Sequence, residues 1–226
     1  MQPMAVGKRK NIKSDFMKIL LIESQYFPSL EYYLTLLRYD KLKIERYEHY
    51  QKVTYRNRCY VAGPNGRILL SVPLERGKNQ RTPMKEVRIC NGERWQALHW
   101  KTLESAYRRS PWFEYFEDEL APCFGRRYHF LLDWNLEMFD RINRLLDLDI
   151  TYELTDSFRL TYEEPGLTDA RDRILPGAWR QEDTAGDYPV YTQVFGERTG
   201  FLPNLSILDL LFCEGKNAKE ILEAAR

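Results

Sequence analysis

The first segments of the sequence predict a strand, a loop and a helix in close succession. The apolar run Ile19 to Ile22 has the length of a buried strand, Glu23 to Pro28 breaks the pattern, and apolar residues return at helical spacing from Tyr32 to Leu37. From Leu42 to Tyr47 they alternate, as in a second strand. This order favours an α/β fold, in which the loop at Glu23 to Pro28 lies at the carboxyl edge of a sheet, where ligands usually bind.

A β-hairpin and a helical section follow. Two strand-like segments, Arg58 to Val61 and Arg67 to Pro73, flank an Asn65-Gly66 step that favours a turn with positive φ. Val87 to Cys90 has the pattern of a further short strand. Helical spacing and capping signals predict helices over about residues 94–109, after Ser110-Pro111, over 130–146, from Ser206 to Gly215 and from Asn217. We therefore expect an α/β single domain with a mixed sheet, an early strand-loop-helix unit, a β-hairpin and a helical middle section.

Composition excludes several classes of protein. The chain has 226 residues, 43% hydrophobic and 30% charged, which is ample for one folded domain. Its net charge of +1 argues against a broad basic face, so nucleic acid is not an expected partner. No apolar run approaches the roughly 18 residues of a membrane span. We expect residues 17–226 to form the domain, residues 1–16 to be a disordered extension without a signal peptide, and the protein to be cytoplasmic, with its oligomeric state left open.

The sequence also predicts neither a metal site nor a cofactor. The four cysteines lack the close spacing of zinc or redox motifs, so free thiols are expected. The nucleophile-elbow, dinucleotide-binding and phosphate-binding glycine-loop patterns do not occur. Common hydrolase, dehydrogenase and nucleotide triphosphatase mechanisms are therefore not indicated.

The loop after the first strand holds the first candidate ligand-binding residues, Gln25, Tyr26 and Phe27. An amide both donates and accepts hydrogen bonds, so Gln25 is suited to a sugar hydroxyl or a base edge. The alternative is a turn in which that amide only fixes the backbone.

A second candidate is the basic stretch from Lys52 to Arg58. Lys52, Arg56 and Arg58 alternate with tyrosines, and Asn57 lies among them. Guanidinium groups match phosphate oxygens and aromatic rings stack on sugars or bases, which points to an anionic small molecule such as a nucleotide-sugar. The alternative is a solvated strand face.

His99 is the candidate catalytic residue, because it shares a helix face with Trp95 and Thr102 and titrates in the range that acid–base catalysis requires. A catalytic His99 must be accessible in a cleft, whereas a structural one can be sealed in the core. Asn204 either reaches a ligand or caps the helix that follows it.

Several sequence motifs occur in a fixed order over roughly residues 18–215. They are Ser24 to Pro28, Gln51 to Arg58, Val72 to Leu74, Trp95 with His99, Tyr107 to Phe113, and Phe201 to Phe212. Together they resemble the WbqC-like family of bacterial proteins. The family commonly has Gln-Pro where this chain has Gln25-Tyr26, so Gln25, Phe27 and Pro28 are the residues that match in the first motif.

The resemblance implies a role in bacterial surface-polysaccharide or O-antigen synthesis. The leading hypothesis is a transferase-type enzyme for a nucleotide-activated or lipid-linked sugar, with Gln25, Lys52, Arg58 and His99 around its pocket. The alternative is a non-catalytic accessory protein that binds a saccharide or a partner, so the sequence leaves open whether the chain is an enzyme. We further expect the polar loop Glu75 to Pro83 to be disordered without ligand and to close over the Gln25 edge when a ligand binds. The alternative is a solvated extension of the hairpin that does not touch a ligand.

Overall fold

A parallel sheet positions the polar residues discussed below. The computed structural model describes residues 17–75, 81–177 and 188–225. Within these ranges the sheet has four strands in the order β5-β2-β1-β6, and all neighbouring pairs are parallel. The strands are β1 (Ile19–Glu23), β2 (Lys41–Glu45), β5 (Tyr152–Leu154) and β6 (Leu167–Asp169). Because β1 lies inside the sheet, its apolar run is buried on both faces, as is typical of parallel strands.

Helix α1 (Leu30–Leu36) connects β1 to β2 and confirms the predicted strand-loop-helix-strand unit. After β1 the chain therefore turns towards β2, whereas β6, the neighbour on the other side, comes more than a hundred residues later. The place where connections diverge in this way is the usual ligand-binding crevice of an open parallel sheet. Here it lies between the carboxyl ends of β1 and β6.

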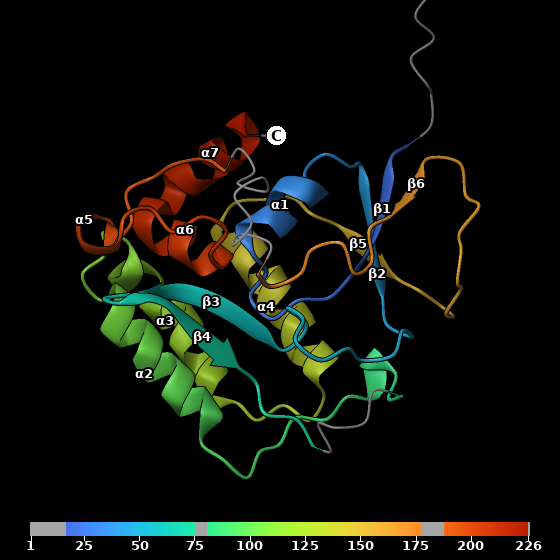
Figure 1. Cartoon of the computed structure of the whole chain (residues 1–226), viewed down its shortest axis with the longest axis horizontal. Helices are drawn as coiled ribbons and strands as arrows, with labels where there is room; N and C mark the ends of the chain where they lie inside the picture. Colours follow the sequence, from blue (N-terminus) through green and yellow to red (C-terminus); the bar gives the residue numbers. More distant parts are fainter. Residues whose placement is uncertain (1–16, 76–80, 178–187, 226) are drawn as a thin grey trace, which may run out of the picture.

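The predicted hairpin is present as β3 (Arg58–Gly63) and β4 (Gly66–Ser71), which pair only with each other among the described residues. Gly66 has φ +111°, so the Asn65-Gly66 step supplies the positive φ that the turn requires. Figure 1 shows the hairpin crossing the middle of the molecule, with α2 and α3 on one side and α6 on the other.

Helices make up most of the remaining structure. They are α2 (Trp95–Tyr107), α3 (Phe113–Gly125), α4 (Leu131–Leu145), α5 (Gly196–Thr199), α6 (Ile207–Glu214) and α7 (Ala218–Ala224), with 3-10 turns η1 (Met84–Glu86) and η4 (Gly215–Asn217). In the described part of the chain no helix is long and apolar enough to cross a bilayer. The helical middle section and the single α/β domain are thus as predicted.

One predicted strand is absent. Val87 to Cys90 forms only two isolated bridges, Leu74 with Ile89 and Arg88 with Phe130, because its neighbours on both sides are loops. The four cysteines are free, as expected. The expected extension at residues 1–16, and residues 76–80 of the expected lid, lie outside the described residues.

Candidate functional site

Carboxylates gather at the carboxyl edge of the parallel sheet. Three strands end in an acidic residue, namely Glu23 in β1, Glu45 in β2 and Asp169 in β6. Because parallel strands end at the same edge, these side chains come together, and the loops that follow β2 and β6 add Glu48 and Asp172. We refer to these five residues as the acidic edge.

Arg171 forms ion pairs with two carboxylates of the acidic edge, those of Glu45 and Asp169. Its guanidinium lies 2.6 Å from Asp169 Oδ2 and 3.3 Å from Glu45 Oε2. The guanidinium also lies over the rings of Phe158 and Tyr162, at 5.2 and 5.3 Å from their centroids. Arg171 therefore fixes the segment that contains these aromatic residues against the strand ends.

Arg56 is fully buried and forms ion pairs with two other carboxylates of the acidic edge, those of Glu48 and Asp172. It donates two hydrogen bonds of 2.7 Å to the Glu48 carboxylate and one of 2.8 Å to Asp172 Oδ1. Asp172 also accepts from Gln51 and donates its backbone N–H to Glu23 Oε2 at 3.1 Å. These bonds tie the Gln51 to Arg58 motif to the ends of β1 and β6.

Burial changes the protonation of this part of the site. Burial raises the pKa of Glu23, and it raises the pKa of Glu48 to about 7 even though hydrogen bonds from Arg56 act in the opposite direction. Burial alone would lower the pKa of Arg56, but the hydrogen bonds and charge of Glu48 outweigh it and raise that pKa, so the guanidinium stays charged. Glu48 thus exchanges its proton near neutral pH.

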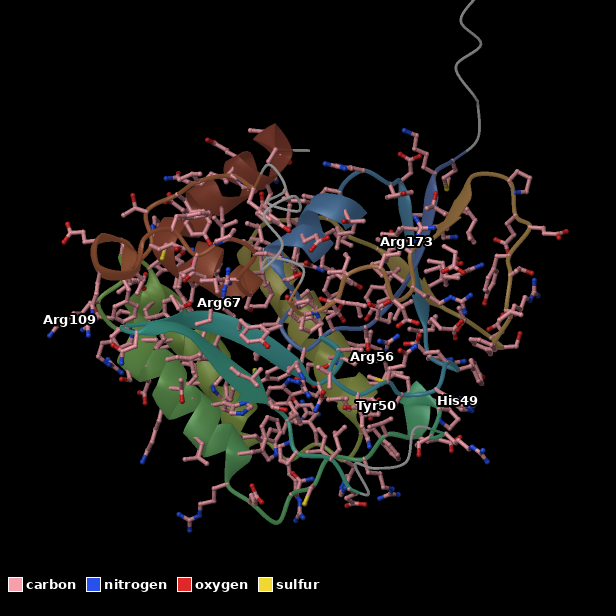
Figure 2. The ribbon with its side chains drawn as sticks, in the orientation of Figure 1. His49, Tyr50, Arg56, Arg67, Arg109 and Arg173 are labelled. Atoms are coloured by element: carbon pink, nitrogen blue, oxygen red, sulfur yellow. The ribbon has the colours of Figure 1, made fainter. Side chains whose placement is uncertain are left out.

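A cavity of about 400 Å³ opens beside Arg56, next to the loop after β2. Its lining includes Glu48, His49, Tyr50, Gln51, Lys52, Phe158, Arg171 and Asp172. Lys52 has no carboxylate partner among the residues that the structure describes, in contrast to Arg171. Figure 2 shows Arg56, Tyr50 and His49 on the side of the molecule where β3 begins.

One residue beside the cavity has a strained backbone. Val53 has φ +59°, in the left-handed region that β-branched residues rarely adopt, whereas Asp172, at φ +60°, is a residue type that adopts this region more readily. Val53 is 63% exposed, so side-chain packing does not explain its presence there. Strain that packing does not require is often found at functional sites.

The first predicted motif lies in the core and not on an open edge. Gln25, Tyr26 and Phe27 are all buried, and Gln25 Oε1 contacts the backbone N–H of Ser29 at 3.5 Å. This placement favours the alternative in which the Gln25 amide fixes the backbone. The Gln25 Nε2 atom is buried without a partner in the described residues.

His99 is brought to this motif but is sealed from solvent. Its Nδ1 lies 2.7 Å from the Tyr26 hydroxyl, and only 7% of the residue is exposed. Burial lowers the pKa of His99 to about 4, while a hydrogen bond to the Ser71 backbone works in the other direction. His99 is therefore neutral at physiological pH, which favours the structural role that the sequence left open.

Asn57 and Asn204, two further predicted ligand residues, make structural contacts, and Asn204 does not have the helix-capping role expected as an alternative. Asn57 accepts from the Tyr50 hydroxyl and donates to the Val72 carbonyl. Asn204 does not cap the helix that follows it, because Ser206 caps α6. Asn204 Oδ1 instead accepts from the backbone N–H of Glu31, in α1, at 2.9 Å.

Comparisons with known proteins identify the family of the chain. The model of the WbqC-like protein family matches residues 23–175, about two thirds of the chain. The chain belongs to this family. The uncharacterized protein Rv1507c of Mycobacterium tuberculosis is 26% identical over 239 aligned positions, which cover 92% of this chain and 99% of that protein. No solved structure matches the chain.

The family motifs at the two ends of the resemblance are packed against each other. Ser29 and Ser206 form an antiparallel bridge, and the Ser206 hydroxyl donates to the Phe27 carbonyl at 3.0 Å. The loop after β1 and the segment before α6 therefore build one structural junction. The segment from Gln51 to Arg58, within the residues that the family model matches, is the one that reaches the cavity.

The predicted cations of the segment from Gln51 to Arg58 have different surroundings. Arg56 is held by carboxylates and Lys52 lines the cavity, as described above. Arg58 is partly exposed at the start of β3, and its Nε atom is buried without a hydrogen-bond partner in the described ranges. Glu48, Asp172 and Phe158 were not predicted as site residues. Glu23, which directly follows the first predicted strand, was a local signal for the edge that they border.

Charge and geometry limit what this site can hold. In the residues that the structure describes, no group of three or more histidine, cysteine, aspartate or glutamate side chains is arranged to hold a metal ion. The carboxylates of the acidic edge are instead paired with two guanidinium groups, those of Arg56 and Arg171. The arrangement offers oxygen acceptors, one aromatic surface, one unpaired ammonium group and one acid that titrates near neutral pH.

Proposed function

We propose that this WbqC-like protein is a transferase-type enzyme that acts on a nucleotide-activated or lipid-linked sugar in bacterial surface-polysaccharide synthesis, and that the cavity beside the acidic edge is its substrate site. One observation supports this proposal more than any other. Glu48 and Lys52 line the same cavity at the carboxyl edge of the parallel sheet, so an acid–base group and an unpaired cation face one space.

The lining suits the two ends of an activated sugar. The Lys52 ammonium, which has no carboxylate partner in the described part of the chain, is suited to a phosphate oxygen. Sugar hydroxyls would donate to Asp172 and Glu48, since ionised carboxylates have acceptor positions beyond those that Arg56 and Gln51 occupy. The ring of Phe158, half exposed at the cavity wall, offers an apolar surface to a sugar ring.

Glu48 would act as the general base. In the proposed step, an acceptor hydroxyl attacks the anomeric carbon of the sugar, a new carbon–oxygen bond forms, and the bond to the phosphate oxygen breaks. The phosphate leaves with the bonding electrons, and the hydroxyl proton passes to the Glu48 carboxylate. A pKa of about 7 matches this task at neutral pH, and Arg56 orients the carboxylate without entering the cavity lining.

The alternative function is a non-catalytic protein that binds a saccharide intermediate or a partner enzyme. The burial of His99 is the observation that favours it, because an accessible histidine was the expected mark of catalysis. This alternative requires the same cavity but no role for the titration of Glu48. The cytoplasmic location expected from the sequence stays a prediction under both functions.

Calorimetric titration with a panel of uridine, thymidine, guanosine and cytidine nucleotide-sugars tests the proposal. We expect at least one of them to bind, and Lys52→Ala to weaken that binding roughly tenfold or more, since a hydrogen bond to a charged group is worth about 1.5 to 3 kcal/mol. Lys101→Ala, in an exposed lysine of α2, is the matched control and should bind like the parent. Equal loss in both variants, or no binding by the parent, contradicts the proposal.

A further inference from the structure

A second cavity lies at the start of α4 and shares no lining residue with the first. It has a volume of about 640 Å³, in the range of small-molecule sites. Its lining includes Arg88, Arg126, Arg127, Phe130, Asp133 and Glu137. None of these residues belongs to the site proposed above, so the two cavities can be tested separately.

The backbone around this cavity is held in place. The Ile89 N–H donates to the His129 carbonyl, and the Leu131 N–H donates to the Val87 carbonyl, each at 2.9 Å. Arg88 and Phe130 face each other in the bridge between these bonds. On the other side, the Asn91 amide donates to the Tyr128 carbonyl at 2.8 Å. The side chains of the lining therefore project from a fixed framework.

Two of the arginines have no carboxylate partner within the described ranges. The guanidinium carbon of Arg88 lies 5.1 Å from the centroid of the Phe130 ring. The ring packs against the flat face of the guanidinium, so the N–H groups at the edge of the guanidinium can donate to a ligand. Arg127 is exposed beside it. Arg126, by contrast, is paired with Glu137 at 3.0 Å and stacked over Tyr128.

Charge in the cavity therefore favours an anion. The Arg126–Glu137 pair is neutral, which leaves Arg88 and Arg127 against Asp133 alone. Paired N–H donors of arginine fit the tetrahedral oxygens of phosphate better than they fit a single-point anion.

We propose that this cavity is a phosphate-binding site, in which Arg88 and Arg127 hold the phosphate or diphosphate group of a ligand and Asp133 accepts a hydrogen bond from a hydroxyl group of the same molecule. Two sources supply this chemistry, a free phosphorylated molecule and the phosphate headgroup of a lipid. A nucleic acid fits less well, because the site is one cavity and the whole chain has a net charge of only +1.

Titration of the full chain with inorganic pyrophosphate tests the site, with Lys52→Ala as the background to remove the first cavity. We expect Arg88→Ala and Arg127→Ala each to weaken pyrophosphate binding roughly tenfold or more. Arg109→Ala is the matched control, because Arg109 is an exposed arginine outside the lining of this cavity, and it should leave binding unchanged.

Co-sedimentation with phosphatidylcholine vesicles, with and without phosphatidic acid, distinguishes the two sources. Pyrophosphate binding without vesicle binding indicates a free ligand. Binding to phosphatidic acid vesicles that is lost in Arg88→Ala and Arg127→Ala indicates a headgroup. The proposal is overturned when neither probe binds, or when both arginine variants bind as well as Arg109→Ala does.

Discussion

The Tyr26 hydroxyl and the Nδ1 atom of His99 lie 2.7 Å apart, and both side chains are buried. The bond joins the loop after β1 to α2, so two WbqC-like motifs that are 73 residues apart in sequence stabilise each other. Each ring also contacts a tryptophan, Tyr26 beside Trp134 and His99 beside Trp95. The pair is therefore part of an aromatic core, and its removal should be measured as a loss of stability.

We expect Tyr26→Phe to lower the free energy of unfolding by about 1 to 3 kcal/mol, because it leaves His99 Nδ1 buried without a partner. Urea denaturation followed by circular dichroism measures the change. Tyr115→Phe is the control, since Tyr115 is 59% exposed, and it should change stability little. Equal effects of the two substitutions would show that the Tyr26–His99 bond has no stabilising role.

His99 should also make stability depend on pH. Its pKa is lowered by burial from the ordinary value of about 6.5 to about 4, so the unfolded chain binds this proton more readily than the folded one. The stabilisation is complete above about pH 6.5 and is lost as the pH falls towards 4, a change on the order of 3 kcal/mol. Glu48 acts in the opposite direction, because its raised pKa favours the folded state at lower pH.

The difference between the parent and His99→Gln isolates the histidine from Glu48. The unfolding free energies of the parent and of His99→Gln, measured at several pH values between 7 and 4, should converge as the pH falls. A difference that stays constant over this range contradicts a buried neutral His99.

Val53→Gly should stabilise the protein by about 0.5 to 1 kcal/mol. Glycine adopts the left-handed conformation of Val53 without strain, which stabilises the folded state by about 1 to 2 kcal/mol. Part of this gain is lost because glycine also makes the unfolded chain more flexible. Thermal unfolding measures the gain. Val190→Gly is the matched control, because Val190 is also exposed but has no positive φ, and it should be neutral or destabilising. A loss of stability in Val53→Gly would show that the strain assignment is wrong.

Arg56→Ala should destabilise the fold by about 3 to 5 kcal/mol, because it leaves Glu48, Asp172 and Glu23 as buried or part-buried carboxylates without their cation. The loss should shrink at acidic pH, where those carboxylates are protonated. Arg58→Ala, two residues away and partly exposed, should cost less than about 1 kcal/mol. Denaturant titrations of both variants at neutral and acidic pH check the contrast, and an Arg56→Ala protein as stable as Arg58→Ala would contradict it.

Local sequence signals were sufficient to predict those elements that are determined by neighbouring residues. Gly66 marked the hairpin turn and Ser206 marked the start of α6, because each acts on neighbouring backbone. Val87 to Cys90 was predicted wrongly as a strand, because a strand needs a partner and the sequence does not state which segments meet.

The candidate site depends on contacts between distant residues, which local patterns in the sequence do not specify. Lys52 lines a cavity, but whether Arg56 faces a ligand or Glu48 and Asp172 depends on the pairing of β1 with β6. Likewise, the burial of His99 depends on Tyr26 reaching it from another motif.

The central claim is that Glu48 is the general base in the cavity beside the acidic edge. Its most direct test is the rate at which Glu48→Gln transfers the sugar of a bound nucleotide-sugar to water, followed by phosphorus NMR. We predict a loss of roughly 10²- to 10⁴-fold in this rate relative to the parent, while the exposed-residue control Glu114→Gln retains the parent rate. Turnover by Glu48→Gln at the parent rate, or no turnover by a parent protein that binds the ligand, would contradict the claim.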